Sequence, residues 1–298
     1  MKTKAIVPPL KSQGIKTKLV PWIAEAVPSF GGTWVEPFLG TGVVAFSIGF
    51  ERAILNDSNP HIIKFYEAVQ KGKITPAIAR EYLAREGAAL ACAGDNGYDH
   101  FRLVRDRFNA TGDPLDLLFL SRAGFNGMMR FNGSGKWNIP FCKKPNRFSP
   151  SYITKIANQI RNSASVIKNG WQLFNKSFKE IIPLAKKGDV IYCDPPYFGR
   201  YVDYYNGWTE EDENELFELL SQTDAFFILS TWHHNDFRQN DMVAKYWNKF
   251  NILTKDHFYH GGGKIENRNA VVEALVLNFN PPESVPTHRL NAEQLALV

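Results

Sequence analysis

Residues 33–45 read Thr33-Trp-Val-Glu-Pro-Phe-Leu-Gly-Thr-Gly-Val-Val-Ala45, in which two apolar runs flank a glycine-containing turn. The first run, Thr33–Phe38, is rich in β-branched and aromatic residues and predicts a strand, and the residues after Gly42 predict the start of a helix. Gly40 and Gly42 let the backbone turn tightly and approach a ligand where a side chain would clash. The N–H groups at the start of the helix would then face that ligand. Because Gly40-x-Gly42-x-x-Ala45 also fits a dinucleotide fingerprint, the stretch indicates a nucleoside-type cofactor without identifying it.

Further strand-like runs follow at 53–56, 171–174, 189–193, 225–231, 252–258 and 270–279. Helical patterns lie between most of them, most clearly at Thr209–Gln222, where Thr209 can cap the helix and Asp212 follows three residues later. Strands that alternate with helices predict an α/β fold of the Rossmann-like kind, with a mostly parallel sheet covered on both sides. The last two runs, joined by Gly261-Gly-Gly-Lys264, predict a hairpin and therefore one antiparallel strand in that sheet.

The stretch from Val69 to Lys168 breaks this alternation. It contains two helical segments, Pro76–Leu90 and Tyr98–Asn109, and then Gly-, Asn- and aromatic-rich sequence from 124 to 148. The sequence therefore predicts a catalytic, cofactor-binding domain formed by residues 1–68 and 169–280 and an inserted, mainly helical recognition domain formed by residues 69–168. Residues 281–298 are expected to form a loosely held tail.

The charges are distributed unevenly. Residues 117–179 contain eleven Lys and Arg residues and no Asp or Glu, whereas the rest of the chain has 24 basic and 30 acidic residues. A chain that is acidic except for one basic block is suited to meet a polyanion with a single surface. Lys143, Lys144 and Arg147 in this block are expected to contact phosphates.

The remaining composition is that of a cytoplasmic protein with reduced thiols. No apolar run approaches the ~20 residues of a membrane span, and the N-terminus has no secretory signal. Cys92, Cys142 and Cys193 have no close spacing, so neither disulfides nor a zinc site is expected. The pairs His233-His234 and His257-x-x-His260 lack a Cys or carboxylate that would complete a metal site, so no metal is expected.

Two carboxylates are placed to act on a ligand. Asp57 ends the strand that follows the glycine turn, where a carboxylate can bind ribose hydroxyls. Asp189-Val-Ile-Tyr-Cys-Asp-Pro-Pro-Tyr197 is a strand that ends in the rigid tetrapeptide Asp194-Pro195-Pro196-Tyr197. The carboxyl edge at which both lie is where parallel α/β sheets bind their ligands.

The tetrapeptide suits the methylation of an aromatic amino group. The lone pair of such a nitrogen is delocalised into the ring, so the nitrogen is a poor nucleophile until both of its hydrogens are bound. Asp194 supplies one acceptor and the carbonyl of Pro195 the second, which the consecutive prolines hold in place. Tyr197 can stack on a base taken out of a duplex. A methyl group would then move in line from a sulfonium without a covalent enzyme intermediate.

These motifs resemble the Dam-like, D12 class of adenine-N6 DNA methyltransferases. The resemblance is carried, in the family's order, by Lys11-Ser-Gln-Gly-Ile-Lys16, Glu36–Gly42, Asp57 and Asp194–Tyr197, and it extends to about residue 279. Arg122-x-x-x-Asn126-Gly-x-x-Arg130-x-Asn132 and Asn138-Ile-Pro-Phe141 resemble the family's DNA-reading hairpin. Within the family the chain is most similar to EcoRV-type modification methylases, at residues 11–21, 141–148 and 231–235.

The resemblance implies the S-adenosyl-L-methionine methyltransferase fold and S-adenosyl-L-methionine as cofactor. Lys16 would contact its methionine part, Asp57 its ribose, and Asp194 would lie between cofactor and target amine. Ser12 and Ser177 stand where many relatives have a tryptophan and an acidic residue beside the cofactor adenine, so Phe38 or Phe178 would hold that ring. The cofactor-binding residues expected are Ser12, Lys16, Glu36, Pro37, Phe38, Gly40, Gly42, Asp57, Phe178 and Asp194.

The partner implied is double-stranded DNA, with adenine N6 of a flipped base as target. The DNA-binding residues expected are Lys11, Arg122, Asn126, Arg130, Asn132, Lys136, Asn138, Lys143, Lys144 and Arg147. Phe198–Trp208 would form either a lid over the flipped base or a surface loop. The resemblance also implies a monomer that does not bind membranes. The enzyme would belong to a restriction–modification system, without a stable complex with any cognate endonuclease, or would be an orphan or phage relative. Its recognition site would be GATATC.

Three other functions use the same residues. Cytosine-N4 methylation shares the amine chemistry of Asp194. Methylation of RNA or of a protein glutamine amide needs the same acceptors. A regulatory DNA-binding protein that kept the fold would bind without turnover, although the intact tetrapeptide argues against it.

Overall fold

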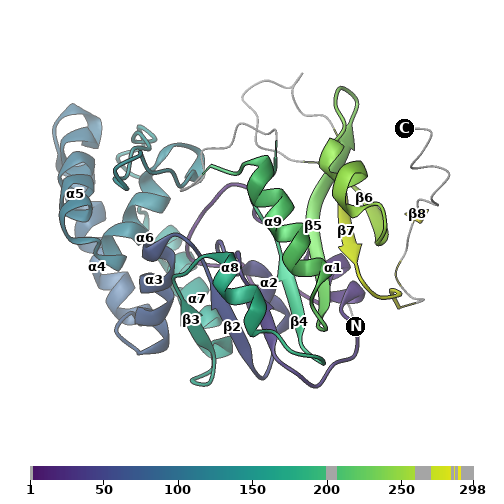
Figure 1. The fold of residues 1–298 in the computed structure, drawn as a ribbon. Coiled ribbons are helices and arrows are strands. Elements are labelled where there is room, and N and C mark those ends of the chain that lie inside the picture. Colours follow the sequence, from purple (N-terminus) through teal and green to yellow (C-terminus); the bar gives the residue numbers. More distant parts are fainter. Residues whose placement is uncertain (1–2, 199–206, 259–269, 283–284, 286–287, 290–298) are drawn as a thin grey trace.

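The computed structural model describes residues 3–289 except 199–206, 259–269, 283–284 and 286–287. These residues form an eight-stranded sheet with the strand order β3-β2-β1-β4-β5-β7-β6-β8 (Figure 1). Along the chain the strands are β1 Trp34–Glu36, β2 Ala53–Asn56, β3 Gln172–Phe174, β4 Val190–Cys193, β5 Phe226–Asn235, β6 Asn251–Phe258, β7 Ala270–Leu277 and β8 His288–Arg289.

The sheet is mostly parallel, as predicted. Strands β3, β2, β1, β4 and β5 pair in parallel, and β7 enters between β5 and β6 with antiparallel pairing to both. The predicted pairing of residues 252–258 with 270–279 is confirmed, while the Gly261–Lys264 turn lies outside the described residues. The chain progresses from β1 to β2 and β3 on one side and continues through β4 and β5 on the other. The carboxyl ends of β1 and β4 therefore form the crevice in which such sheets bind ligands.

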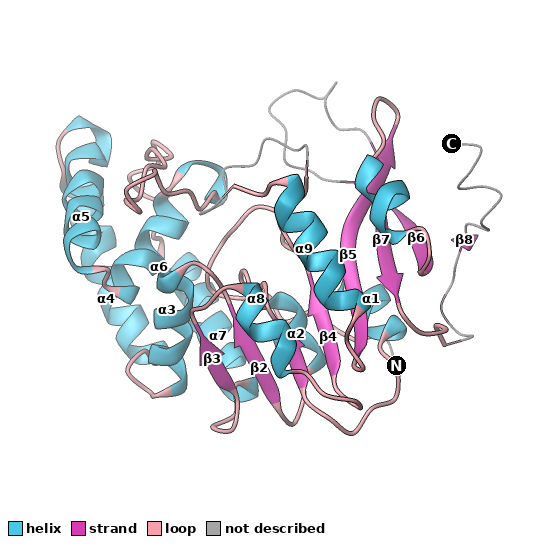
Figure 2. Ribbon diagram, viewed as in Figure 1, coloured by secondary structure: helices cyan, strands magenta, loops and turns pink. Residues whose placement is uncertain are grey.

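Helices cover both faces of the sheet (Figure 2). Helices α1 (Val20–Ala26), α2 (Val43–Ile48) and α3 (Pro60–Gln70) contribute to one hydrophobic cluster, and α8 (Phe178–Ile181) and α9 (Glu210–Ser221) to the other. The alternation of strand side chains explains the two clusters: in β4, Val190 and Tyr192 belong to the first, and Ile191 and Cys193 to the second. The predicted cap of α9 is present, because Thr209 and Asp212 form a reciprocal capping box.

The connection between β2 and β3 is unusually long. These strands are parallel neighbours, which one crossover helix would suffice to connect. Residues 57–171 instead contain α3 and four further helices, which are α4 Pro76–Cys92, α5 Tyr98–Thr111, α6 Pro114–Ala123 and α7 Pro150–Val166. In Figure 1, α4, α5 and α6 gather beyond the β3 edge of the sheet.

A repeated sequence signal starts these helices. Each of α3, α4, α6 and α7 begins with a proline at its first position, directly after a residue whose side chain accepts a backbone N–H of the first turn. The proline loses nothing there, because its missing N–H would have no helical partner. The capping residues are Asn59, Thr75, Asp113 and Ser149.

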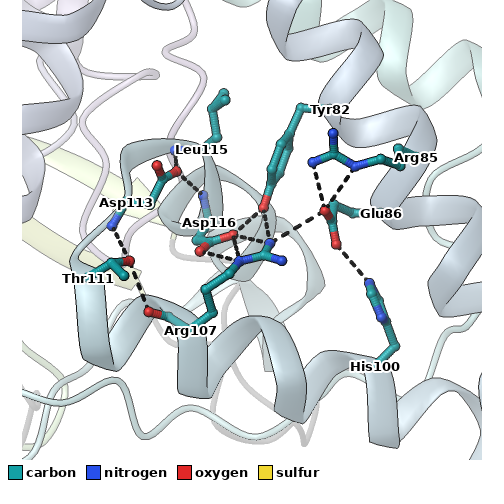
Figure 3. A network of polar contacts seen from close by, with 9 residues as sticks. All are labelled: Tyr82, Arg85, Glu86, His100, Arg107, Thr111, Asp113, Leu115 and Asp116. Carbon is teal, nitrogen blue, oxygen red and sulfur yellow. Dashed lines mark hydrogen bonds and ion pairs between the residues drawn. The ribbon is translucent and has the colours of Figure 1, made fainter.

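Polar contacts hold α4, α5 and α6 together (Figure 3). Asp116 of α6 is 1% exposed and accepts hydrogen bonds from Tyr82 of α4 and from Arg107 of α5. The Arg107 guanidinium also donates to the Tyr82 hydroxyl at 2.8 Å and lies 3.4 Å from Glu86. Glu86 pairs in addition with His100 at 2.9 Å.

The segment from Pro281, predicted as a loose tail, is attached at two points. Val285 is 5% exposed in the core, and β8 pairs antiparallel with β6 through Leu253 and Thr254. Residues 290–298 lie outside the described residues. None of the described helices combines the length and the apolar character needed to cross a bilayer.

Candidate active site

A cavity of about 670 Å³ opens at the carboxyl ends of β1, β2 and β4. This volume is in the range of small-molecule sites, roughly 300–1,000 Å³. The residues that line it come from segments far apart in the sequence, and lie within 12–16, 36–44, 56–62, 129–131, 175–180, 192–196 and 207–212 without filling every position of these ranges. Of the expected cofactor residues, only Gly42 is absent from its lining, and the others are Ser12, Lys16, Glu36, Pro37, Phe38, Gly40, Asp57, Phe178 and Asp194.

The glycine turn has the predicted conformation, and the N–H groups of its two glycines form hydrogen bonds within the protein. Gly40 and Gly42 have φ of 52° and 79°, the left-handed region that favours glycine. A Cβ on Gly42 would lie 2.5 Å from the Phe46 ring, so this glycine is needed for packing. The Gly40 N–H donates to Asp57 Oδ2 at 2.7 Å, and the Gly42 N–H donates to the Leu39 carbonyl at 2.8 Å. The N–H groups of these two glycines are therefore used within the protein, and the expectation that the N–H groups at the start of the helix face a ligand stays a prediction.

Asp57 lines the cavity with a carboxylate that the backbone already orients. Its second oxygen, Oδ1, accepts the Asn59 N–H at 2.8 Å. Burial raises the pKa of Asp57 to about 6, against the lowering effect of these two hydrogen bonds. Asp57 thus connects the end of β2 to the glycine turn and presents a fixed acceptor at the cavity wall.

Glu36 adds a second carboxylate at the end of β1. It is 2% exposed and accepts a hydrogen bond from Trp34 Nε1 at 2.8 Å. Burial, with smaller contributions from the negative charges of Asp194 and Asp57, raises the pKa of Glu36 to about 8, against the lowering effect of its hydrogen bonds with Trp34 and the Ala45 backbone. Glu36, Asp57 and Asp194 are three of the five acids that line the cavity, and such a lining favours the cationic part of a ligand. The positively charged sulfonium and ammonium groups of S-adenosylmethionine fit these carboxyl groups.

Three aromatic rings form an apolar wall of the same cavity. The Phe38 ring lies 5.4 Å from Phe178 and 5.6 Å from Trp208, and the latter two rings are 5.5 Å apart. This wall suits a flat heterocycle such as adenine. Ser177, the residue at the departing position, accepts backbone hydrogen bonds as the N-cap of α8 and forms a capping box with Glu180. Trp208 was predicted as part of either a lid or a surface loop, and residues 199–206 of that stretch lie outside the described residues.

Asp194 lies at the other end of the cavity, paired with a lysine. Lys16 Nζ is 2.8 Å from Asp194 Oδ1, and the lysine side chain is 3% exposed. Burial raises the pKa of Asp194 and the Lys16 charge lowers it. Pro196 also lines the cavity, and Pro195 is buried beneath it. The same cavity thus borders the Asp194 carboxylate and the glycine turn at Gly40.

Tyr197 is held more tightly than the sequence indicated. Its ring is 8% exposed and clusters with Trp232 and Val271, and its hydroxyl donates to Glu273 Oε2 at 2.7 Å. Glu273 is fully buried in β7. This glutamate was not predicted as a site residue, although a lone acid within the apolar run Val271–Leu277 is a signal that it has a specific partner.

A hairpin is present where the sequence predicted one, and its role in reading DNA stays a prediction. Bridges join Gly124 to Phe141 and Phe131 to Trp137, and the Asn132 side chain closes the turn between them by accepting two backbone N–H groups. The aromatic residues Phe131, Trp137 and Phe141 point inward, so that Lys136 and Asn138 alternate outward.

Aromatic contacts join the hairpin to the helices and to the cavity. The Phe131 ring stacks on His61 of α3, with 5.2 Å between the ring centres. The backbone N–H of Trp137 donates to Oδ1 of Asn109 in α5 at 2.8 Å. Met129 and Phe131 also line the cavity. The segment expected to read DNA therefore reaches the rim of the site that holds Asp194.

Four of the other expected DNA-binding residues are accessible to solvent. Asn126, Lys143 and Lys144 are exposed, and Arg130 is half-buried and donates to Asn138 Oδ1 at 2.9 Å. Phe125, which was not predicted to bind DNA, is 48% exposed beside Asn126.

The expectation that Arg122 contacts DNA is wrong. It is 1% exposed, and its guanidinium donates to the Pro9 carbonyl and to Gln159 Oε1, so it holds the N-terminal segment against α7 and does not reach DNA. Lys11 and Arg147 are half-buried around Tyr152, whose pKa the neighbouring cations lower against the effect of burial.

The histidines next to each other in β5 contact one another, with His233 Nδ1 and His234 Nδ1 2.8 Å apart. Across the described residues, no group of three or more His, Cys, Asp or Glu side chains is arranged to hold a metal ion. His260 lies outside those residues.

Comparisons with known proteins agree with this geometry. Residues 12–260 match the profile of the D12 class N6 adenine-specific DNA methyltransferases. The DNA adenine methylase of Vibrio cholerae is 31% identical over 72% of this chain and 76% of its own length, and the retron Ec67 DNA adenine methylase of Escherichia coli is 29% identical over 71% of both. The type II methyltransferase M.FokI of Planomicrobium okeanokoites is 26% identical over 91% of this chain, which spans 42% of that protein.

Among solved structures, an rRNA methyltransferase from Streptomyces viridochromogenes overlaps 91% of this chain and 86% of its own, at 11% identity and a TM-score of 0.35. A similarity this weak says nothing about the substrate. The family match covers most of the chain and includes every motif that lines the cavity. The enzyme class and S-adenosyl-L-methionine as methyl donor, both expected from the motifs, are thereby confirmed, and the chain belongs to the D12 class N6 adenine-specific DNA methyltransferase family.

Proposed function

We propose that this enzyme methylates adenine N6 at a specific site in duplex DNA, with the target base turned out of the helix toward Asp194. One observation carries the proposal: a single cavity joins the Asp194 carboxylate to the Gly40 turn, with the hairpin residues Met129 and Phe131 at its rim. A base inside a duplex cannot reach a recessed carboxylate unless it leaves the stack.

The chemistry at Asp194 follows from its position. Its carboxylate accepts one N–H of the target amine and the Pro195 carbonyl accepts the other, so that the nitrogen lone pair turns from the ring toward the cavity. When bound, S-adenosylmethionine supplies a methyl group that is electrophilic because the sulfur keeps the C–S electron pair on leaving. The proton that the amine then loses passes to the Asp194 carboxylate or to water.

The cavity lining supports specific cofactor contacts. When the cofactor is bound, Glu36 would hold its cationic methionine part, and Asp57, fixed by the backbone, would accept the ribose hydroxyls. Phe38, Phe178 and Trp208 would hold its adenine ring. Many relatives have a tryptophan and an acidic residue at the positions of Ser12 and Ser177. In this chain the aromatic wall and the Asp57 carboxylate would take over their role.

DNA lies against the basic surface of the insertion. Lys136, Asn138, Lys143 and Lys144 are exposed there, and Asn126 and Phe125 project beside the hairpin. We assign residues 69–168 to target recognition and residues 1–68 and 169–280 to catalysis. The recognition unit shares one hydrophobic cluster with the sheet, so the two parts pack against each other.

The names of two relatives, the type II methyltransferases M.FokI and M1.LlaDCHI, support a role in restriction–modification. Under this proposal the enzyme acts in the cytoplasm as a monomer, protects DNA from a cognate endonuclease, and recognises GATATC as EcoRV-type enzymes do. A retron DNA adenine methylase among the relatives keeps the orphan or phage alternative open.

The test is to express the protein in cells that lack other DNA methylases and to sequence the modified bases. We expect N6-methyladenine at one short motif, with GATATC as the first candidate. N6-methyladenine at another motif would replace only the recognition sequence. N4-methylcytosine, or methyl transfer to RNA or protein with none to duplex DNA, would refute the proposed reaction.

A further inference from the structure

Lys16 is fixed at the catalytic carboxylate by its own backbone. Its carbonyl accepts the N–H groups of Leu19 and Val20 at 2.8 and 3.0 Å, which anchors the residue to the start of α1. From there the side chain runs inward, and Nζ lies 2.8 Å from Asp194 Oδ1 and 4.7 Å from the centre of the Tyr197 ring. The ammonium therefore sits between two members of the catalytic tetrapeptide.

The surroundings of Asp194 are otherwise acidic or neutral. The negative charges that act on it are those of Glu273 on β7 and Glu36 on β1, and the neighbouring neutral groups on β4 are the Tyr192 hydroxyl and the Cys193 thiol. Among the described groups that act on Asp194, Lys16 is the one that favours the charged carboxylate. Burial and the two glutamates favour the protonated form.

We propose that Lys16 is a positioning residue for the reaction: its ammonium keeps Asp194 ionised and fixed through Oδ1, so that Oδ2 is presented to the N–H of the target adenine. This inference rests on the function proposed above. Because the ion pair with Lys16 is made through Oδ1, Oδ2 is the oxygen that can serve as the acceptor. A protonated Asp194 would offer a hydroxyl to the amine and would accept its hydrogen more weakly.

A lysine that only binds the cofactor makes a different prediction from one that acts on Asp194. Loss of a cofactor ligand weakens cofactor binding and leaves the pH dependence at saturating cofactor unchanged. Loss of a charge that keeps Asp194 ionised moves the acidic limb of the rate to higher pH, because an opposite charge within about 4–6 Å lowers a carboxyl pKa by about 1–3 units.

The experiment compares Lys16→Met and Lys16→Arg with Lys18→Met, an exposed lysine two residues away. Single-turnover methyl transfer is measured from pH 5 to 9, with both S-adenosylmethionine and DNA saturating. We expect the acidic limb of Lys16→Met to move upward by about one pH unit or more. Lys16→Arg should restore it, and Lys18→Met should match the unsubstituted enzyme.

A second measurement needs no substrate. Carbon-13 labelling of aspartate reports the titration of Asp194, assigned by its loss in Asp194→Asn, and the Lys16 Nζ resonance should follow the same titration in the unsubstituted protein. This readout holds even if Lys16→Met fails to fold.

An Asp194 titration to which the Nζ resonance does not respond would overturn the inference. So would a Lys16→Met enzyme with weaker cofactor binding and an unshifted acidic limb. Full activity in Asp194→Asn would instead refute the proposed function itself, so the two failures are distinguishable.

Discussion

At the scale of single residues, the main feature of the site is its set of buried carboxyl groups. Glu36, Asp57 and Asp194 share one cavity, and burial raises the pKa of each. Like charges this close disfavour simultaneous ionisation. A cationic cofactor relieves that conflict, so its binding and the ionisation of these acids are coupled.

The coupling predicts the pH dependence of cofactor binding. With a pKa of about 8, Glu36 is mostly protonated at pH 7 in the free enzyme. A bound cation lowers that pKa, so binding at pH 7 should release a proton and affinity should rise as pH increases toward 8. Isothermal titration calorimetry in buffers of different ionisation enthalpy measures the proton directly. Proton uptake, or an affinity in Glu36→Gln that keeps the full pH dependence, would contradict this assignment.

At the scale of elements, the sequence predicted the strands and the order in which they alternate with helices. It missed ends that depend on tertiary pairing. The run at 225–231 was expected to stop at Thr231, yet β5 continues to Asn235 because β7 pairs with it from Ile228 to Asn235, across an irregularity between Trp232 and His234. Glu273 was missed, and Trp208 was expected only in a lid or a surface loop, for the same reason. Only the fold brings Trp208, just before α9, against Phe38 after β1, and Glu273 of β7 against Tyr197 after β4.

Arg122 shows the opposite error. Its place in a family-like pattern suggested a DNA contact, but it lies in α6, where the continuous apolar run Leu117–Leu120 is buried on every side. An arginine at the end of such a run is carried inside with it. Its carbonyl and amide partners at Pro9 and Gln159 are remote in sequence, and no local pattern indicates them.

The network of Figure 3 makes a prediction about the recognition helices. Asp116→Asn removes a buried charge that Arg107 and Tyr82 both contact, so it should destabilise the fold by about 2–3 kcal/mol. Asp106→Asn is the matched control, because Asp106 is exposed and its pair with Arg105 is a surface contact; it should cost less than about 0.5 kcal/mol. Urea unfolding measures both. Equal effects would show that the network does not hold α4, α5 and α6 together.

At the scale of the whole molecule, the asymmetry of charge follows the fold. The acid-free stretch 117–179 supplies the hairpin and α7, while α9 carries four acidic residues in its first turn. The cavity has both signs of charge, because Lys176 and Lys179 of the basic stretch line it together with Glu36, Asp57 and Asp194. The exposed basic surface beside the hairpin is the one that we propose meets DNA. The basic block was readable from sequence, whereas which of its members face outward was not.

Salt dependence tests that surface. Lys143 and Lys144 are adjacent and exposed, and replacing both with glutamine should reduce the slope of log affinity against log salt by about 0.9 for each phosphate that is no longer neutralised. Lys186 and Lys187 form an equally exposed adjacent pair before β4, at the edge of the sheet opposite the cavity, and their replacement should leave the slope unchanged. A slope that responds equally to both pairs would remove the hairpin side as the DNA interface.

The most direct test of the account is Asp194→Asn, assayed by single-turnover methyl transfer beside a measurement of cofactor affinity. The substitution keeps the shape of the side chain and removes the charged acceptor, so we expect the transfer rate to fall by about 10²–10⁴-fold while the cofactor still binds. Transfer within tenfold of the unsubstituted rate would contradict the claim that this carboxylate activates the target amine.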